Sequence, residues 1–176
     1  MASNFQYMIK ALFTEKQRFN QRWLIIIVFL TLAVALWSFI QQIVLGIPFG
    51  NNPAPDGILV LLFLTPFILF GFFFSLTLHT RIDQHGITYR FAPIHRKERF
   101  IKWDSVKKIS VRKYKPIAEY GGWGFRLGSS GTAFNTRGNM GLQLELNDGK
   151  KILIGTQKPD ELNRVIIKLE IVKSLN

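Results

Sequence analysis

Two long apolar runs dominate the pattern of hydrophobic and polar positions along the chain. Residues 23–45 and 57–78 are 23 and 22 residues long and contain no Asp, Glu, Lys or Arg. A helix that crosses a bilayer core of about 30 Å needs about 20 apolar residues. Neither run has a polar face that could meet water. The pattern therefore predicts a two-helix transmembrane hairpin over residues 23–78.

The Lys and Arg residues that flank these runs predict which way the hairpin points. The turn at residues 46–56 has neither, whereas both outer flanks are basic. The flanking cations are Lys10, Lys16, Arg18 and Arg22 before the first run, and Arg81, Arg90, Arg96 and Lys97 after the second. Since Lys and Arg favour cytoplasmic flanks, we expect a multi-pass protein of the cell (cytoplasmic) membrane with both termini in the cytoplasm. The first run is too long and begins too late for a cleaved signal peptide, so we expect it to stay as an anchor.

Residues 1–22 are predicted to form a cytoplasmic amphipathic segment. Apolar side chains recur over residues 4–22 at the spacing of a helix. They are Phe5, Met8, Ile9, Leu12, Phe13 and Phe19. Two interpretations are open: the helix lies on the cytoplasmic interface of the membrane, or its apolar face packs on the protein's own soluble domain.

Residues 79–176 are predicted to form a cytoplasmic domain made mostly of strands. Residues 81–91 read as two short strands around a Gln-His-Gly turn. Residues 98–103 alternate, with Phe100 and the indole of Trp103 as the expected buried positions. Each of these segments is short enough for a small, strongly bent sheet.

The second half of this domain adds further strands and one helix. Residues 106–114 alternate with one slip, and residues 141–146 and 150–155 flank an Asn-Asp-Gly turn that predicts a hairpin. Pro159 suits the first turn of a C-terminal helix. Its apolar stripe consists of Leu162, Val165, Ile166, Leu169 and Val172. Such a stripe can cover a sheet or close a barrel.

The glycine-rich stretch 119–141 holds seven of the chain's 14 glycines. The glycine spacing in residues 122–128 differs from the dinucleotide-binding fingerprint, and no strand–loop–helix unit surrounds it. The segment around Gly149 and Lys150 lacks the Ser or Thr and the first glycine of a phosphate-binding loop. Two interpretations are open: a mid-domain hairpin whose glycines let strands bend, or a loop that contacts a ligand or partner.

Composition supports a membrane anchor joined to a basic domain. Hydrophobic residues make up 48% of the chain, yet its formal net charge is +12. Residues 81–176 hold 19 Lys and Arg against 9 Asp and Glu, a net charge of +10. The absence of cysteine excludes a disulfide framework, a thiolate zinc site and a cysteine nucleophile.

This arrangement resembles the bacterial PH-like (pleckstrin-homology-like) domains that stand next to one or two membrane helices. The likeness rests on the strands, on the segments WDSVKKI and LNDGKKILIGTQKPDEL, and on the closing helix. It implies an α+β fold: two transmembrane helices, then a bent antiparallel sheet or barrel of about seven strands with one C-terminal helix. The resemblance implies membrane-surface binding and protein assembly, and it transfers no ligand residues.

No pattern typical of a catalytic or metal site accompanies these elements. His79, His85 and His95 lack the spacing of a metal site. The aspartates sit at expected turns or at the start of the helix, where such residues serve as caps. We therefore expect no catalytic residue, no metal, no cofactor and no enzymatic activity. A membrane-bound enzyme or transporter subunit is the less favoured alternative, because the spans lack an ionisable residue.

The basic residues are the candidate functional groups. Nine Lys and Arg lie within residues 96–115, either as a solvated face or as a surface that attracts anionic lipid headgroups. The candidate lipid or partner contacts are Trp123, Arg126, Arg137, Asn139, Arg96, Lys97 and Lys113. The expected partners are membrane lipids, with anionic headgroups foremost. An oligomeric scaffold is the alternative, through a homo-oligomer or another membrane protein. We expect no nucleic acid partner.

Overall fold

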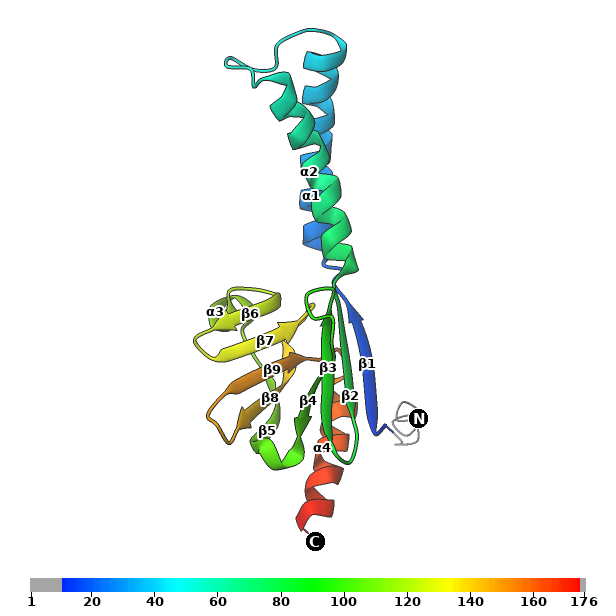
Figure 1. Cartoon of the computed structure of the whole chain (residues 1–176), viewed down its shortest axis with the longest axis vertical. Coiled ribbons are helices and arrows are strands. Elements are labelled where there is room, and N and C mark those ends of the chain that lie inside the picture. The colour runs from blue at the N-terminus through cyan, green and yellow to red at the C-terminus, as the bar shows by residue number, and fades with distance from the viewer. Residues whose placement is uncertain (1–10, 175–176) are drawn as a thin grey trace. The chain divides into compact units, whose positions relative to one another are not determined.

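The computed structural model describes residues 11–174 and divides the chain into two compact units (Figure 1). One unit is the helical hairpin, Asn20–Ser75. The other unit, the β domain, combines Met1–Phe19 with Leu76–Asn176. The hairpin is therefore an insertion within the sequence of the β domain, and the two domain segments on either side of it fold together.

The helical hairpin has the two long helices that the apolar runs predict. α1 spans Arg22–Phe39 and continues as the π-helical segment η2, Ile40–Val44; α2 spans Asp56–Ser75. Residues Trp23–Val44 and Asp56–Ser75 are long and apolar enough to cross a membrane, and only 11% of each apolar window is buried. Phe39 stacks on Phe63 at 4.9 Å between ring centroids and joins the two helices.

One glutamine holds the turn between the helices. The Gln42 side-chain amide donates to the carbonyl of Ala54 at 2.7 Å and to the Asp56 carboxylate at 2.8 Å. Its oxygen accepts from the Phe49 N–H at 3.3 Å. These bonds attach the turn between the two helices to Gln42 of η2. They give hydrogen-bond partners to backbone groups of the turn that have none within a helix.

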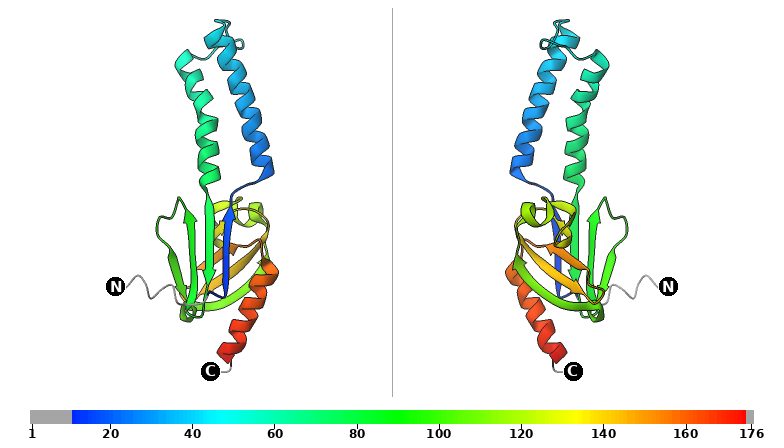
Figure 2. Two further views of the ribbon diagram at one scale, coloured as in Figure 1. Left: turned by 90° about the vertical axis from the view of Figure 1, so that its right-hand side faces the viewer. Right: turned by 90° about the vertical axis from the view of Figure 1, so that its left-hand side faces the viewer.

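The β domain contains two sheets, whose strands are seen from two further sides in Figure 2. The first sheet has the order β1-β2-β3-β4 and is antiparallel throughout, with β1 Phe13–Arg18, β2 Thr77–Ile82, β3 Gly86–Ala92 and β4 Arg99–Lys102. The second has the order β5-β8-β9-β7-β6, with β5 Val106–Lys113, β6 Gly124–Gly128, β7 Gly131–Asn135, β8 Met140–Leu146 and β9 Lys151–Gly155. Three helical segments complete the domain: η3 Trp103–Ser105, α3 Pro116–Tyr120 and α4 Pro159–Ser174.

The α+β class and the C-terminal helix are confirmed, while the details of the sheet differ from the expectation. The described residues form nine strands instead of about seven. One pair, β7 with β9, is parallel. The slip predicted in residues 106–114 is a register shift between Val106 and Lys108.

The expected helix over residues 4–22 is wrong where the structure describes it, because Phe13–Arg18 is strand β1. β1 pairs with β2 in a register from Phe13 opposite Ile82 to Arg18 opposite Thr77. Phe13 and Phe19 are buried in the β domain, which agrees with the interpretation that this segment packs on the protein's own domain. Residues 4–10 of the expected helix lie outside the described residues.

Strand β1 also ties the two sheets together through buried polar side chains. The Glu15 carboxylate accepts from the Thr156 hydroxyl at 2.7 Å and from the Gln157 N–H at 2.8 Å. The Gln17 amide donates to the carbonyl of Gly155 at 2.6 Å and accepts from the Thr136 hydroxyl at 3.0 Å. Buried polar groups are tolerated when they are hydrogen-bonded, so these partners explain why polar residues occupy inward positions.

Side chains from both sheets fill the core of the domain. The Phe134 ring lies 4.9 Å from Tyr89 and 5.3 Å from Phe125, measured between centroids. Other core residues with no more than 1% exposure are Leu78, Ile82, Ile87, Phe91, Leu142, Leu144, Leu153 and Ile154. From α4, Leu162 and Ile166 are buried, as the apolar stripe predicts.

The structure corrects one expected core position in β4. Phe100 is 50% exposed, whereas Ile101 is buried and stands opposite Ile87. A shift of one residue exchanges the two faces of a strand. Trp103 is buried as expected, and its indole N–H donates to the carbonyl of Asp83 at 3.0 Å.

We predict that the β domain folds without the hairpin but not without β1. The Phe19 N–H already donates to the carbonyl of Leu76 at 3.1 Å. Replacing residues 20–75 by Asn-Gly should therefore make an ordinary two-residue β-hairpin and yield a soluble, cooperatively unfolding protein in near-ultraviolet circular dichroism. A chain that begins at Leu76 should give no cooperative transition. Equal stability of the two proteins would contradict the assignment of β1.

We further predict that Phe134→Ala in the Asn-Gly-linked domain lowers the free energy of unfolding by about 3–5 kcal/mol. The substitution empties the centre of an aromatic cluster. Urea unfolding measures the change. Leu127→Ala is the matched control, because Leu127 is 77% exposed and its loss should cost no more than about 0.5 kcal/mol. Similar losses for both variants would refute the described core.

Candidate functional site

The glycine-rich stretch begins at the end of α3 and forms the hairpin β6–β7. Gly121 ends α3 with φ of 70°, a left-handed conformation that favours glycine. A Cβ at Gly128 would lie 2.3 Å from the carbonyl oxygen of Glu119. β6 pairs antiparallel with β7, so the prediction of a mid-domain hairpin is confirmed, while contact of this stretch with a ligand or partner stays a prediction.

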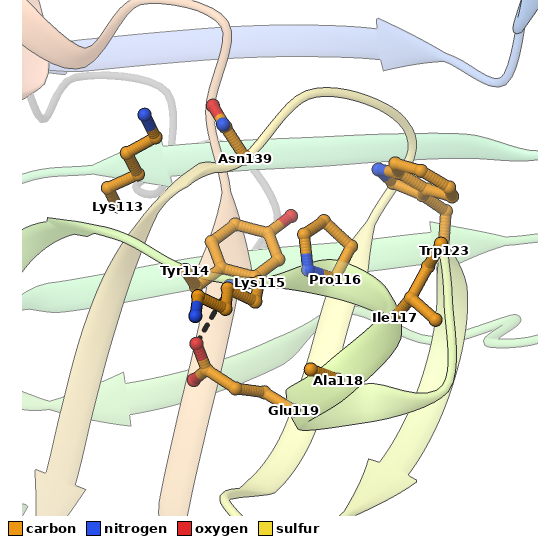
Figure 3. A pocket seen from close by; sticks show the side chains of 9 residues that line it. All are labelled: Lys113, Tyr114, Lys115, Pro116, Ile117, Ala118, Glu119, Trp123 and Asn139. Atoms are coloured by element: carbon orange, nitrogen blue, oxygen red, sulfur yellow. Dashed lines mark hydrogen bonds between the residues drawn. The ribbon is translucent and has the colours of Figure 1, made fainter.

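A groove opens beside this hairpin, at the junction of β5, α3 and the turn between β7 and β8 (Figure 3). Its volume is about 740 Å³. Three of the candidate residues, Lys113, Trp123 and Asn139, lie on its wall. The other lining residues are Tyr114, Lys115, Pro116, Ile117, Ala118 and Glu119. The groove thus combines two lysines, an indole and an exposed aliphatic side chain.

Among the described residues, one carboxylate, Glu119, lies on the groove wall, and it is engaged within the protein. Glu119 accepts from the Arg112 guanidinium at 2.6 Å and from the Lys115 N–H at 2.7 Å. The hydrogen bond from Arg112 lowers the pKa of Glu119 below its ordinary value of 4.5, and the same bond raises the pKa of Arg112. Because this pair neutralises itself, Lys113 and Lys115 give the groove its net positive charge.

Aromatic packing supports the groove from below. Tyr114 and Tyr120 are buried, and their rings meet edge-on at 6.0 Å between centroids. Burial raises the pKa of Tyr114 to about 12, so its phenol stays neutral. The Tyr114 N–H donates to the carbonyl of Asn139 at 2.8 Å, which joins the end of β5 to the turn before β8.

Two further candidate residues, Arg126 and Arg137, are exposed and do not line the groove. Arg126 donates to the carbonyl of Trp123 at 3.0 Å, and the Trp123 indole N–H donates to the carbonyl of Gly138 at 2.8 Å. Arg137 donates to the Gln157 amide oxygen at 3.1 Å. Hydrogen bonds therefore connect Trp123 to Arg126 of strand β6 and to the turn that carries Arg137.

The last two candidates, Arg96 and Lys97, are exposed in the turn between β3 and β4. His95 of this turn contacts the Phe125 ring at 5.1 Å between centroids, so the turn packs toward β6. Within the β domain, this turn and α3 lie at the end where β1 finishes and β2 starts (Figures 1 and 2). We call this the hairpin-linked end.

Sequence reasoning missed a second basic surface on the outer side of the first sheet. Strand register places Lys16 opposite His79, and His79 opposite Arg90. We call the outward cationic positions of this sheet the basic face: Lys16, Arg18, His79, Arg81, Arg90 and Lys102. Burial, then Lys16 and Arg90, lower the pKa of His79. The sequence of residues 13–18 carries no alternation of apolar and polar residues that could have revealed it, because the inward positions include Glu15 and Gln17.

These features define a class of protein: an α+β domain with basic surfaces, interrupted by a helical hairpin apolar enough to cross a membrane. The chain belongs to a family of unknown function, DUF6141, whose family model matches residues 8–174. The match includes both the hairpin and the β domain. A search of curated proteins found no match.

We predict that Glu119→Gln loosens α3 in a pH-dependent way. Because the folded pKa of Glu119 is lowered, its pair with Arg112 stabilises the domain above the ordinary pKa, and this contribution is lost as pH falls through the folded value. At neutral pH the variant should lose about 1 kcal/mol or less, and the difference should vanish in acid. Urea unfolding of the Asn-Gly-linked domain measures both.

Glu98→Gln is the control for this experiment, because Glu98 is an exposed glutamate in another turn. It should leave the free energy of unfolding unchanged at neutral pH. A Glu119→Gln variant whose loss persists at a pH below the folded pKa would contradict the role given to the Arg112 pair.

Proposed function

We propose that the protein is a non-enzymatic protein of the cytoplasmic membrane whose β domain binds anionic lipid headgroups through its hairpin-linked end. The observation that carries this proposal is the shortness of both connections. β1 ends at Arg18 and α1 begins at Arg22, while α2 ends at Ser75 and β2 begins at Thr77. A few residues span at most about 3.6 Å each, so a bilayer around the hairpin lies within reach of this end.

The exposure of the helical hairpin supports a membrane location. Side chains such as Phe29 and Ile68 are 71% and 67% exposed. A soluble protein rarely exposes an apolar surface of this extent, and a lipid environment removes the cost. The basic flanks and the uncharged turn favour an orientation with both termini in the cytoplasm.

A relationship of the β domain to PH-like domains is part of the proposal. Two sheets packed around one core, followed by a C-terminal helix, support it. Two features depart from a simple bent antiparallel sheet: the helical hairpin between β1 and β2, and the parallel pair of β7 with β9.

Charge at the hairpin-linked end supplies the attraction to lipid. Each Lys or Arg near an anionic leaflet contributes about 1 kcal/mol. The groove provides Lys113 and Lys115, and the neighbouring turn provides Arg96 and Lys97. Trp123 beside them suits a headgroup region, where indoles are enriched in membrane proteins. Two tethers keep the domain at the surface, which raises the effective concentration of lipid.

The test is binding of the Asn-Gly-linked β domain to vesicles of phosphatidylcholine with and without phosphatidylglycerol, measured by co-sedimentation. We expect binding only to the anionic vesicles, with a loss as salt increases. Lys113→Glu with Lys115→Glu should weaken it by about tenfold or more. Lys107→Glu with Lys108→Glu, an equal charge change at the other end of β5, is the control. Equal effects of both pairs, or binding to neutral vesicles, would overturn the proposal.

A further inference from the structure

The basic face is a surface on which positive charge predominates. Its outward positions other than the cations hold Thr14, Thr77, Thr88, Ala92 and Phe100. No outward position in the registered strands is a carboxylate. The one acidic strand residue, Glu15, points inward and is hydrogen-bonded to the segment after β9.

The register brings these cations close together. Neighbouring strands are about 4.8 Å apart, so Lys16, His79 and Arg90 form a row about 10 Å long across three strands. Lys16 and Arg90 each lie diagonally across from Arg81, about 7–8 Å away, whereas the lowered pKa of His79 keeps the imidazole between them neutral. Among the described residues, two carboxylates lie near the face: Asp83, 3.8 Å from Arg81, and Glu98, whose charge acts on His79. An anionic partner on this face would remove a repulsion that the folded domain otherwise carries.

Arg90 adds an observation that does not depend on net charge. Its Nε atom is buried, and no described residue accepts a hydrogen bond from it. A buried donor without an acceptor costs free energy. A carboxylate placed over the row would accept hydrogen bonds from the half-buried Arg90 guanidinium and from Lys16, which is exposed two strands away.

We propose that the basic face is a docking surface for an acidic polypeptide segment, separate from the lipid-binding groove. Charge complementarity identifies this occupant. An extended chain presents side chains on one side at every second residue, about 6.8 Å apart, which suits a flat face of cations and threonine hydroxyls. Phe100, half exposed at the edge of the face, provides an apolar contact.

The test uses the full-length protein in nanodiscs of phosphatidylcholine, which offer no anionic lipid. The probe is a fluorescein-labelled glutamate-rich peptide, and fluorescence anisotropy measures its Kd. We expect Lys16→Glu with Arg90→Glu to weaken binding by about tenfold. Lys16→Gln with Arg18→Gln changes two exposed positions on the edge strand and should weaken binding severalfold. This milder variant keeps the test valid if the first variant misfolds. Lys107→Glu with Lys108→Glu should leave the Kd within about twofold.

Four results would overturn this proposal. The peptide could fail to bind, or the control pair could weaken binding as much as the face variants, which would show that bulk charge alone is at work. A single-stranded oligonucleotide of equal charge could bind more tightly through the same residues. Binding to phosphatidylglycerol vesicles is measured separately. If the face variants abolish vesicle binding but leave the Kd for the peptide unchanged, the face contacts lipid and the acidic partner is excluded.

Discussion

The pairing of β1 with β2 is the interaction on which the rest of the structure depends. It joins the residues just before the helical hairpin to those just after it, and a hydrogen bond from Phe19 to Leu76 closes the ladder. Through Glu15 and Gln17, the same strand reaches the second sheet. The β domain is therefore complete only when the strand before the hairpin has paired with the strand after it. Each end of the hairpin is attached to one of these two paired strands.

This architecture gives the two basic surfaces different origins. The groove arises locally, from the end of β5, the short helix α3 and the turns that Trp123 connects. The basic face arises from distant segments, because β1 contributes Lys16 and Arg18 to a sheet otherwise built after the hairpin. In our proposals, the groove contacts lipid headgroups and the basic face contacts an acidic polypeptide. Oligomerisation stays a prediction, as does the expected lack of enzymatic activity.

The sequence predicted those helices and strands whose own residues show a characteristic pattern. The two apolar helices follow from length and the lack of charge, the β8–β9 hairpin from its Asn-Asp-Gly turn, and α4 from its apolar stripe. β1 was missed because its inward side chains include Glu15 and Gln17, whose partners lie about 140 residues later. Phe100 was misplaced because one residue of register exchanges the faces of a strand. Of the candidate site, Lys113, Trp123 and Asn139 meet in one groove, but the basic face requires a pairing that no local pattern contains.

Disulfide crosslinking across the β1–β2 ladder in native membranes tests the central claim most directly. The chain has no cysteine, so Arg18→Cys with Thr77→Cys introduces a single pair at directly opposed positions. Opposed residues lie within the range of a disulfide, whereas an offset of two residues, as in Lys16→Cys with Thr77→Cys, puts the Cα atoms about 7–8 Å apart. We expect rapid intramolecular oxidation of the first pair and little of the second. Oxidation of neither pair, or of both at the same rate, would contradict the insertion of the hairpin between two paired strands.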